Sequence, residues 1–369
     1  MRHLYLAALA AACLGSAGAR AAGVAERVVD PLGRPAPASV HFQQAMLSAV
    51  TRAGERLVAV GERGTVLLSD DGGRNWRQAR RVPVSVLLTA VRFGSAAKGW
   101  AVGHSGVVLR SNDGGETWST QLDGNAAAAL VLKAAQQRAQ AGNGDAAALA
   151  KQVADAQQLV RDGADKPFLD VLADGESGAI VVGAFGLAMR TDDAGKTWRP
   201  WQTEVLGARG SHLYGIAKAG NTIFVAGEQG AFFKSGDNGA TLAELATPYK
   251  GSYFGLTALS ASNVVVYGLR GSVFASGDAG ANWRPAQLAS PASLTAGALL
   301  ADGSLVLASQ AGTLFTSRDQ GLSFAAMQQS SPAPIVGIAQ ARDGGVVIAG
   351  ARGPARIAAH PSSNKTGAP

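Results

Sequence analysis

One short motif occurs six times along the chain, and this repetition limits the possible folds more than any other feature. Each copy reads Ser/Thr-x-Asp-x-Gly-x-x-aromatic, except for one copy that ends in leucine. The copies span Ser69–Trp76, Ser111–Trp118, Thr191–Trp198, Ser235–Leu242, Ser276–Trp283 and Ser317–Phe324. We call this motif the box.

A Gly-x-x-Gly turn that follows a short apolar strand precedes each box. The turns begin at Gly61, Gly103, Gly183, Gly227, Gly268, at Ser309 in the sixth copy, and at Gly350 in a seventh, degenerate copy. These positions lie about 41 to 44 residues apart, except for one interval of 80 residues. A period near 40 built from short strands is typical of a β-propeller. The sequence therefore predicts an all-β, seven-bladed propeller of four-stranded antiparallel blades with Asp-box loops.

The second copy shows how one repeat makes one blade. Residues 87–93 have the alternating side-chain pattern of a strand and should form the innermost one. Residues 99–103 should form the second strand and residues 107–110 the third. The box then forms a loop, and residues 118–121 open the outermost strand. Four short antiparallel strands in about 40 residues are typical of a propeller blade.

The box residues suit a hairpin loop better than a catalytic site. A loop aspartate accepts hydrogen bonds from backbone N–H groups, a glycine adopts a conformation that a Cβ resists, and a tryptophan fills space between blades. We therefore assign a structural role to Asp71, Asp113, Asp193, Asp237, Asp278, Asp319, Trp76, Trp118, Trp198 and Trp283.

The seventh copy has no box and no outer strand. A closed ring needs that strand, because an open strand edge favours aggregation. Residues 38–44, just before the first blade, also have the alternating side-chain pattern of a strand. We expect them to complete the last blade. The predicted propeller thus covers residues 38–359, followed by a disordered tail at residues 360–369.

The first residues have the pattern of an export signal. Residues 4–14 are apolar, and Ala19-Arg20-Ala21 provides a cleavage site, which predicts a signal peptide over residues 1–21 and an extension over 22–37. Cys13, the only cysteine, is a weaker candidate for lipoprotein acylation because the usual leucine is missing before it. We expect a periplasmic protein, peripheral to the membrane at most. The formal charge of +7 comes without a Lys/Arg run, which disfavours nucleic-acid binding.

The doubled interval contains an insertion between blades 2 and 3. Residues 125–163 are rich in Ala, Gln, Leu, Lys and Asp, with a break at Gly142-Asn143-Gly144, which predicts a helical hairpin. The hairpin either packs against the rim without further use or serves as an arm that binds a partner. The sequence leaves both open.

Topology places this hairpin on one face of the propeller. In a four-stranded meander, the turns between strands two and three share a face with the blade-to-blade connections, and the boxes lie on the opposite face. We call these the turn face and the box face. Partner-binding candidates on the turn face are Arg63, Arg270, Arg352, His104, Phe185 and Gln229 in the turns, and Arg80, Arg81, Arg209 and Tyr253 in or beside the connections, with Trp201, Tyr214, Tyr249 and Phe254 nearby. Arginine with aromatics is typical of protein-binding hot spots.

The three arginines Arg63, Arg270 and Arg352 occupy the same place in three repeats. They either form a basic ring around the channel mouth or are separately solvated. The repeat, best seen at Val60–Trp76 and Val102–Trp118, resembles the Asp-box (BNR) propellers and more closely the Ycf48/HCF136 family of photosystem II assembly factors, over residues 45–357. The resemblance implies a lumenal or periplasmic seven-bladed propeller that binds membrane-protein subunits, with an arginine patch taking part.

These observations predict a non-enzymatic, monomeric scaffold that binds a membrane-protein or envelope complex subunit. That complex is photosystem II in a photosynthetic host, and otherwise another complex such as a transporter. The alternative is a secreted sialidase-like glycoside hydrolase, whose arginine triad and Tyr/Glu pair are not evident here. No cofactor is expected, and no metal site, because the histidines lack ligand spacing.

Overall fold

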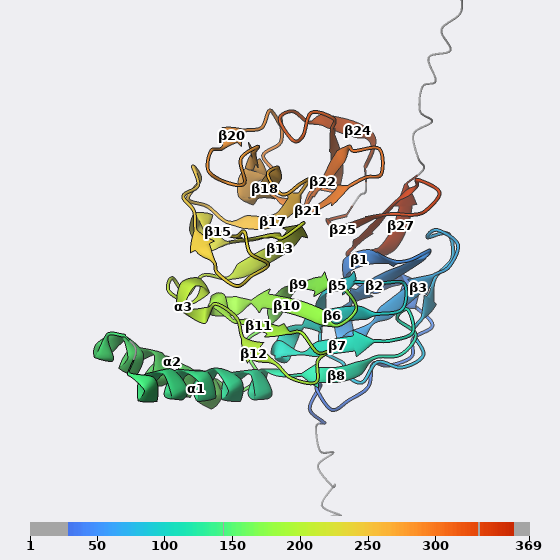
Figure 1. Cartoon of the computed structure of the whole chain (residues 1–369). Coiled ribbons are helices and arrows are strands. Elements are labelled where there is room, and N and C mark those ends of the chain that lie inside the picture. The colour runs from blue at the N-terminus through green and yellow to red at the C-terminus, as the bar shows by residue number, and fades with distance from the viewer. Residues whose placement is uncertain (1–28, 143, 331–332, 358–369) are drawn as a thin grey trace, which may run out of the picture.

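The computed structural model describes residues 29–142, 144–330 and 333–357, and shows seven antiparallel sheets arranged around a central axis (Figure 1). The predicted seven-bladed propeller is confirmed. Six blades have four strands, and the seventh has three among the described residues. The predicted signal peptide, Cys13 and the tail at 360–369 lie outside the described part of the chain.

Each blade is a meander in which neighbouring strands pair in chain order. Blade 1 consists of β1 (Leu47–Ala53), β2 (Arg56–Gly61), β3 (Val66–Ser69) and β4 (Arg77–Gln78), and blade 2 of β5 (Leu88–Phe93), β6 (Gly99–Gly103), β7 (Val108–Ser111) and β8 (Ser119–Leu122). Blade 3 consists of β9 (Phe168–Asp174), β10 (Gly178–Gly183), β11 (Ala188–Thr191) and β12 (Arg199–Pro200), and blade 4 of β13 (Leu213–Ala219), β14 (Thr222–Gly227), β15 (Phe232–Ser235) and β16 (Ala243–Glu244). Blade 5 consists of β17 (Tyr253–Ala258), β18 (Val264–Gly268), β19 (Val273–Ser276) and β20 (Arg284–Pro285), and blade 6 of β21 (Leu294–Leu299), β22 (Leu305–Ser309), β23 (Thr313–Ser317) and β24 (Ala325–Ser330). Blade 7 consists of β25 (Ile335–Gln340), β26 (Val346–Gly350) and β27 (Gly353–Ile357).

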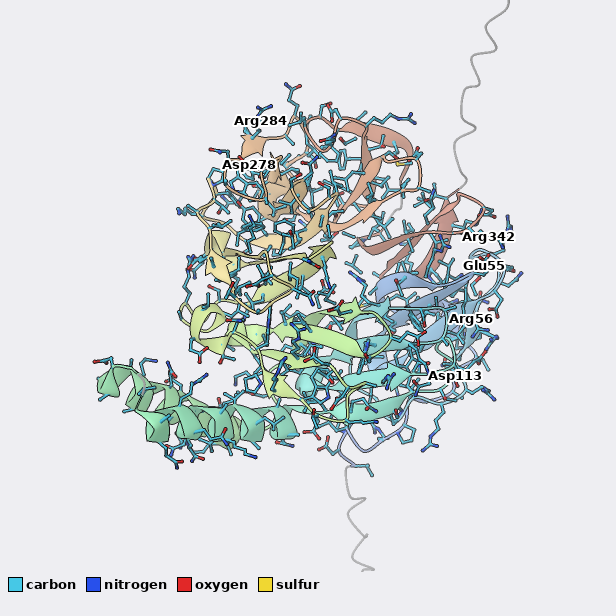
Figure 2. All side chains as sticks on the ribbon, viewed as in Figure 1. Glu55, Arg56, Asp113, Asp278, Arg284 and Arg342 are labelled. Atoms are coloured by element: carbon cyan, nitrogen blue, oxygen red, sulfur yellow. The ribbon has the colours of Figure 1, made fainter. Side chains whose placement is uncertain are left out.

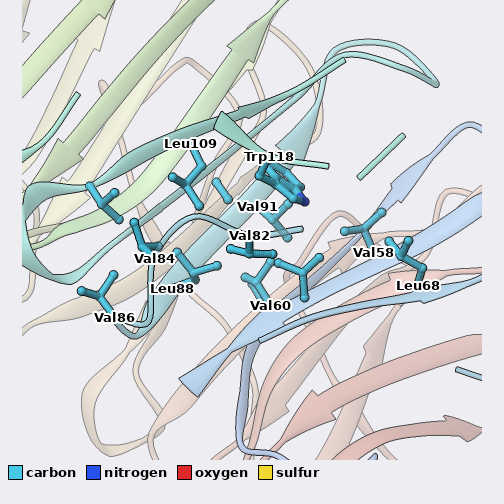
Figure 3. Close-up of a cluster of buried hydrophobic side chains, with 14 of the residues drawn as sticks. Val58, Val60, Leu68, Val82, Val84, Val86, Leu88, Val91, Leu109 and Trp118 are labelled. Atoms are coloured by element: carbon cyan, nitrogen blue, oxygen red, sulfur yellow. The ribbon is translucent and has the colours of Figure 1, made fainter. Parts of the chain in front are cut away.

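The core lies between blades, as separate apolar layers. The layer between blades 1 and 2 brings Val58 and Leu68 of blade 1 against Leu109 and Trp118 of blade 2 (Figure 3). Because a blade is covered on both faces, its second strand is almost entirely buried, and β6 is buried along its whole length. Each blade is thus stabilised only in contact with its neighbours.

The box forms a tight loop held by its own side chains. In the second copy the Ser111 hydroxyl donates to Asp113 Oδ1 at 2.9 Å and accepts the Gly115 N–H at 2.8 Å. Asp113 Oδ1 also accepts the Thr117 N–H at 2.9 Å. Gly115 has φ +89°, and a Cβ there would lie 3.1 Å from Leu68 of the neighbouring blade. The Trp118 indole donates to Gly115 O at 2.9 Å.

These bonds stabilise the ionised form of the box aspartates. Hydrogen bonds from the residue four positions along the chain are the main cause that lowers the pKa to about 2 in Asp71, Asp193, Asp237, Asp278 and Asp319. For Asp113, burial opposes the shift, but the bonds from Thr117 and Ser111 prevail and the pKa is lowered.

Arginines join several of the boxes to the preceding blade. Arg110 Nη1 donates to Ala194 O at 2.7 Å, and Arg190 Nη1 donates to Asn238 O at 2.8 Å. Arg356 occupies the same register position in β27 and donates to Gly72 O of blade 1. In these contacts the acceptor residue has a positive φ, which turns its carbonyl toward the previous blade. The contact thus recurs at the junction between the last and first blades.

The prediction that residues 38–44 add the fourth strand of blade 7 is wrong. Residues Phe42–Gln44 form a 3-10 turn, η1, against β27, and the Ser39 N–H donates to the Gln78 side chain. The Gln78 side chain, rather than a neighbouring strand, therefore accepts a backbone N–H of this segment. Phe42 packs into the layer between blades 7 and 1. The extension just before it is also docked, because Ser85 N donates to Pro31 O and Ala36 N to Val82 O.

We expect Arg356→Ala to destabilise the protein by roughly 1–3 kcal/mol, because the side chain is 19% exposed, donates to Gly72 O across the ring junction and pairs with Asp343 of its own blade. Urea unfolding measures the change. The matched control is Arg342→Ala, whose ion pair with Glu55 spans the same junction at 75% and 63% exposure and should contribute at most about 0.5 kcal/mol. Equal effects of the two substitutions would contradict this role of Arg356.

The lowered pKa values of the box aspartates predict acid sensitivity. Their stabilisation is fully present above the unfolded pKa near 3.8 and is lost as the pH falls toward about 2. The free energy of unfolding in urea should therefore fall steeply between pH 4 and pH 2. Asp237→Asn removes one titrating group and should make that dependence shallower. A free energy of unfolding that stays constant over this range would rule out the explanation.

Candidate protein-docking face

The Gly-x-x-Gly turns meet the blade-to-blade connections on one side of the ring. Gly64 N donates to Val86 O at 2.7 Å, and Gly230 N donates to Gly251 O at 2.8 Å. A Cβ on Gly106 would lie 2.6 Å from Gly124, where the helical insertion begins. The turns, the connections and the hairpin therefore form one continuous surface, the turn face.

The middle residue of five turns adopts a left-handed conformation although it is not glycine. These residues are Arg63, Ser105, Phe185, Gln229 and Arg270, with φ between 53° and 58°. A left-handed non-glycine residue costs roughly 1–2 kcal/mol. Each of these five turns keeps this unfavourable conformation and projects a side chain from its middle residue.

Arg63 and Arg270 are exposed, and no described residue forms a hydrogen bond or an ion pair with their guanidinium groups. Arg352 is also exposed and unpaired within the described chain, but its turn differs. Gly350 pairs directly with Gly353, so the blade 7 turn is tighter and Arg352 has no positive φ. The predicted equivalence of the three arginine positions in their turns therefore holds only for Arg63 and Arg270.

The other predicted residues fall into different environments. His104, Gln229 and Arg81 are exposed, and Phe185 is 57% exposed. Arg209 lies on the turn face and pairs with Glu244 at 2.5 Å.

Two predicted residues do not belong to the turn face. Arg80 extends toward the box of blade 2, 3.6 Å from Glu116, because its backbone bridges to that loop. Tyr253 is fully buried, since the first residue of every innermost strand points into the core and the next one points to the channel.

A chain of rings leads from the turn face toward the central channel, and the sequence revealed only part of it. Phe185 contacts His212 edge to face at 4.6 Å, followed by Tyr214 and then Phe254. The Phe185 N–H donates to His212 Nδ1 at 3.1 Å, which fixes the turn to the next blade. No sequence signal linked His212 to Phe185, because the contact joins two blades.

Glu228 fixes the middle of this chain. It accepts the His212 N–H at 2.9 Å and the Tyr214 O–H at 3.2 Å. Burial, together with the Glu228 carboxylate, raises the pKa of Tyr214 to about 12. Tyr214 therefore stays protonated and donates at neutral pH. Phe185, at the outer end, is the exposed ring of a rigid cluster.

The helical hairpin consists of α1 (Gly124–Ala141) and α2 (Ala146–Asp162), close to the predicted boundaries. Asp123 and Asp145 cap the two helices by accepting backbone N–H groups at 2.9 and 2.8 Å. In Figure 1 the hairpin extends beyond the rim of the propeller. The α1 helix contacts β12 and the turn of blade 2, and Arg138 pairs with Glu204 of α3 (Thr203–Leu206).

The ionisable groups of the described residues offer no metal centre. No group of three His, Cys, Asp or Glu side chains among them is arranged to hold a metal ion. Within the same residues no helix is long and apolar enough to cross a membrane. Figure 2 shows charged side chains such as Arg284, Arg342 and Glu55 at the surface of the propeller.

A family model described as photosynthesis system II assembly factor YCF48 matches residues 36–112 and 150–364. The unmatched residues include β8, α1 and the start of α2, so the family model does not cover most of the hairpin. No curated protein sequence matches the chain.

Several solved structures are similar in fold to this one. "YCF48 bound to D1 peptide" has 18% identity and a TM-score of 0.61, with 86% of this chain and 95% of that chain covered. YCF48 from Cyanidioschyzon merolae has 16% identity and a TM-score of 0.61, with 87% and 97% covered. The WD40 β-propeller domain of Doa1 has 10% identity and a TM-score of 0.60, with 91% and 99% covered. At these identities the similarity supports the fold.

The left-handed turns predict a specific effect of glycine. Arg270→Gly and Arg270→Ala both remove the guanidinium, but only alanine keeps the strain at φ 58°. We expect the glycine variant to be about 1 kcal/mol more stable than the alanine variant in thermal or urea unfolding. At Arg352 the order should reverse, because glycine gains nothing in the folded state and increases the entropy of the unfolded chain. The same order at both sites would contradict the analysis.

Proposed function

Because the chain belongs to the family of photosynthesis system II assembly factor YCF48, we propose that it is a non-enzymatic propeller that binds a segment of a membrane-protein subunit. The family model covers most of the propeller, and one similar structure is a YCF48 bound to D1 peptide. In a photosynthetic host the partner is a photosystem II subunit. In another host it is a subunit of a different envelope complex, such as a transporter, and the protein acts in the periplasm after export.

The turn face is the surface that we propose for docking. Arg63 and Arg270 present free guanidinium groups from rigid turns, and Phe185 presents a largely exposed ring. Arginine and aromatic residues dominate binding energy at protein interfaces. Anchors that are already fixed lose little entropy on binding, which strengthens binding for a given contact area. This combination of free cations and a fixed aromatic ring is the observation that carries the proposal.

A binding role also fits the carboxylates of this face better than hydrolysis does. Glu62 accepts the Met46 N–H at 2.8 Å, Glu204 pairs with Arg138, and Glu228 holds His212 and Tyr214. A glycoside hydrolase needs two carboxyl groups that are free to act on either side of one bond. These three are each engaged in fixing the fold, which disfavours the sialidase-like alternative.

Charge reversal on the turn face tests the proposal. The triple variant Arg63→Glu, Arg270→Glu, Arg352→Glu should lower capture of the membrane-protein partner from solubilised envelope by about tenfold or more, as expected when interface arginines are reversed. Quantitative mass spectrometry of the captured proteins provides the measurement.

A control triple on the box face makes the same change in net charge. Arg284, Arg318 and Lys196 are exposed there, and we expect their joint replacement by Glu to leave capture unchanged. If both triple variants lose capture alike, the effect comes from net charge. If neither does, docking does not use these arginines. Thermal unfolding of each variant verifies that the propeller is intact.

A further inference from the structure

The innermost strands line a central channel, and one position in them departs from the repeat. The residue that follows the bulge of each innermost strand pairs with the residue just before the turn glycine of the second strand. In six blades this residue is small: Ala49, Ala90, Gly215, Gly255, Ala296 and Gly337. In blade 3 it is Asp170. All seven line a cavity of about 550 Å³.

Asp170 is buried, and its oxygens are already in use. Oδ1 accepts the Val171 N–H at 2.9 Å, and Oδ2 accepts the Ile216 N–H of the next blade at 3.1 Å. Arg92 Nη2 lies 3.5 Å from Oδ1. Burial raises the pKa of this carboxyl, with Arg92 acting in the opposite direction. The carboxylate therefore lies beside the channel-facing guanidinium, while its oxygens accept backbone N–H groups.

A second departure lies across the channel. The position that pairs with Gly255 is Tyr267, whereas the other six blades have valine or alanine there. A Cβ on Gly255 would lie 2.6 Å from the Tyr267 ring, and a Cβ on Gly297 would lie 2.8 Å from it. The two glycines thus make room for this side chain at the cavity wall. Burial raises its pKa to about 12, so the phenol keeps its proton.

Several side-chain hydrogen-bond donors line the channel wall. Arg92 carries five N–H groups, and the described chain shows one of them bonded, to Val91 O at 3.0 Å. The Thr257 hydroxyl lines the same cavity, is buried and interacts with the Tyr267 hydroxyl, so the two form one polar group at the cavity wall. Lys218 also lines it, paired with Asp174 at 2.6 Å. The Arg92 guanidinium is accessible to a ligand at 44% side-chain exposure, and an anionic oxygen is the strongest acceptor for such a donor.

We propose that the central channel binds a small oxyanion, a carboxylate or a phosphate, through Arg92 with Tyr267 and Thr257 as neutral donors. The cavity volume suits a small organic acid or a phosphate group with water around it. Arg92, Tyr267 and Thr257 lie inside the ring and are not among the turn residues proposed for docking, so loss of anion binding can be distinguished from loss of partner capture.

Titrations with inorganic phosphate and with citrate, at constant ionic strength against sodium chloride, test the site. Isothermal calorimetry and the thermal midpoint should show binding of at least one anion to the wild type. Arg92→Gln should weaken it by about tenfold or more, because a charged donor is lost. Tyr267→Phe, which removes one hydroxyl, should weaken it several-fold and serves if the first variant does not fold. Arg284→Gln, at an exposed arginine of the box face, is the matched control and should bind like the wild type.

Asp170→Ala distinguishes an anion site from a purely structural pair. Alanine is what other blades carry at this position, and its introduction removes a negative charge next to Arg92. We expect this variant to bind the anion as tightly as the wild type or more tightly. Equal loss in Asp170→Ala and Arg92→Gln would overturn the proposal, and so would the absence of any anion-specific heat or stabilisation. Preference for phosphate or for citrate identifies the source of the oxyanion.

Discussion

The fold depends on the junction between blade 7 and blade 1, the one place where neighbouring blades are far apart in the chain. Every blade needs a neighbour on each side to cover its apolar faces, so the ring is stable only when closed. Val347 and Ala349 of blade 7 pack against Leu57 and Trp76 of blade 1. Arg356 of blade 7 then crosses the junction to Gly72 O, while Asp343 of the same blade pairs with its guanidinium. A shared strand, which the sequence predicted, is replaced by an apolar layer and a partly buried arginine.

The two faces of the ring use their polar groups differently, and this difference separates scaffold from binding surface. On the box face, the aspartates are satisfied by hydroxyl and backbone donors within the same loop, which is why their pKa values are low. On the turn face, the guanidinium groups of Arg63 and Arg270 are unpaired among the described residues, and both residues have a left-handed backbone. A charge without an internal partner contributes little to stability, so its rigid presentation points to an external partner.

The repeat allowed the fold to be predicted, because period, turn glycines and box residues all act locally. The hairpin was predictable for the same reason, since its capping residues and composition are local signals. Contacts between blades were not. Tyr253 seemed a surface aromatic because the bulge that points it inward leaves no trace in the residue pattern. Alternation at residues 38–44 matched a strand, but Gln78, which is distant in sequence, binds that backbone first. The Phe185–His212 pair was missed because it joins neighbouring turns.

Departures from the repeat are therefore the positions where function can be separated from fold. Six blades show that alanine or glycine is sufficient at the position of Asp170, so the ring does not need a carboxylate there. Burying one costs free energy even when backbone N–H groups satisfy it. The same reasoning applies to Tyr267, which fits only because Gly255 and Gly297 leave space. Asp170 and Tyr267 are thus two costly departures from the repeat, and both line one cavity together with Arg92. Packing alone does not explain why they occur at the same place. They are consistent with a ring whose interior is adapted to hold a ligand.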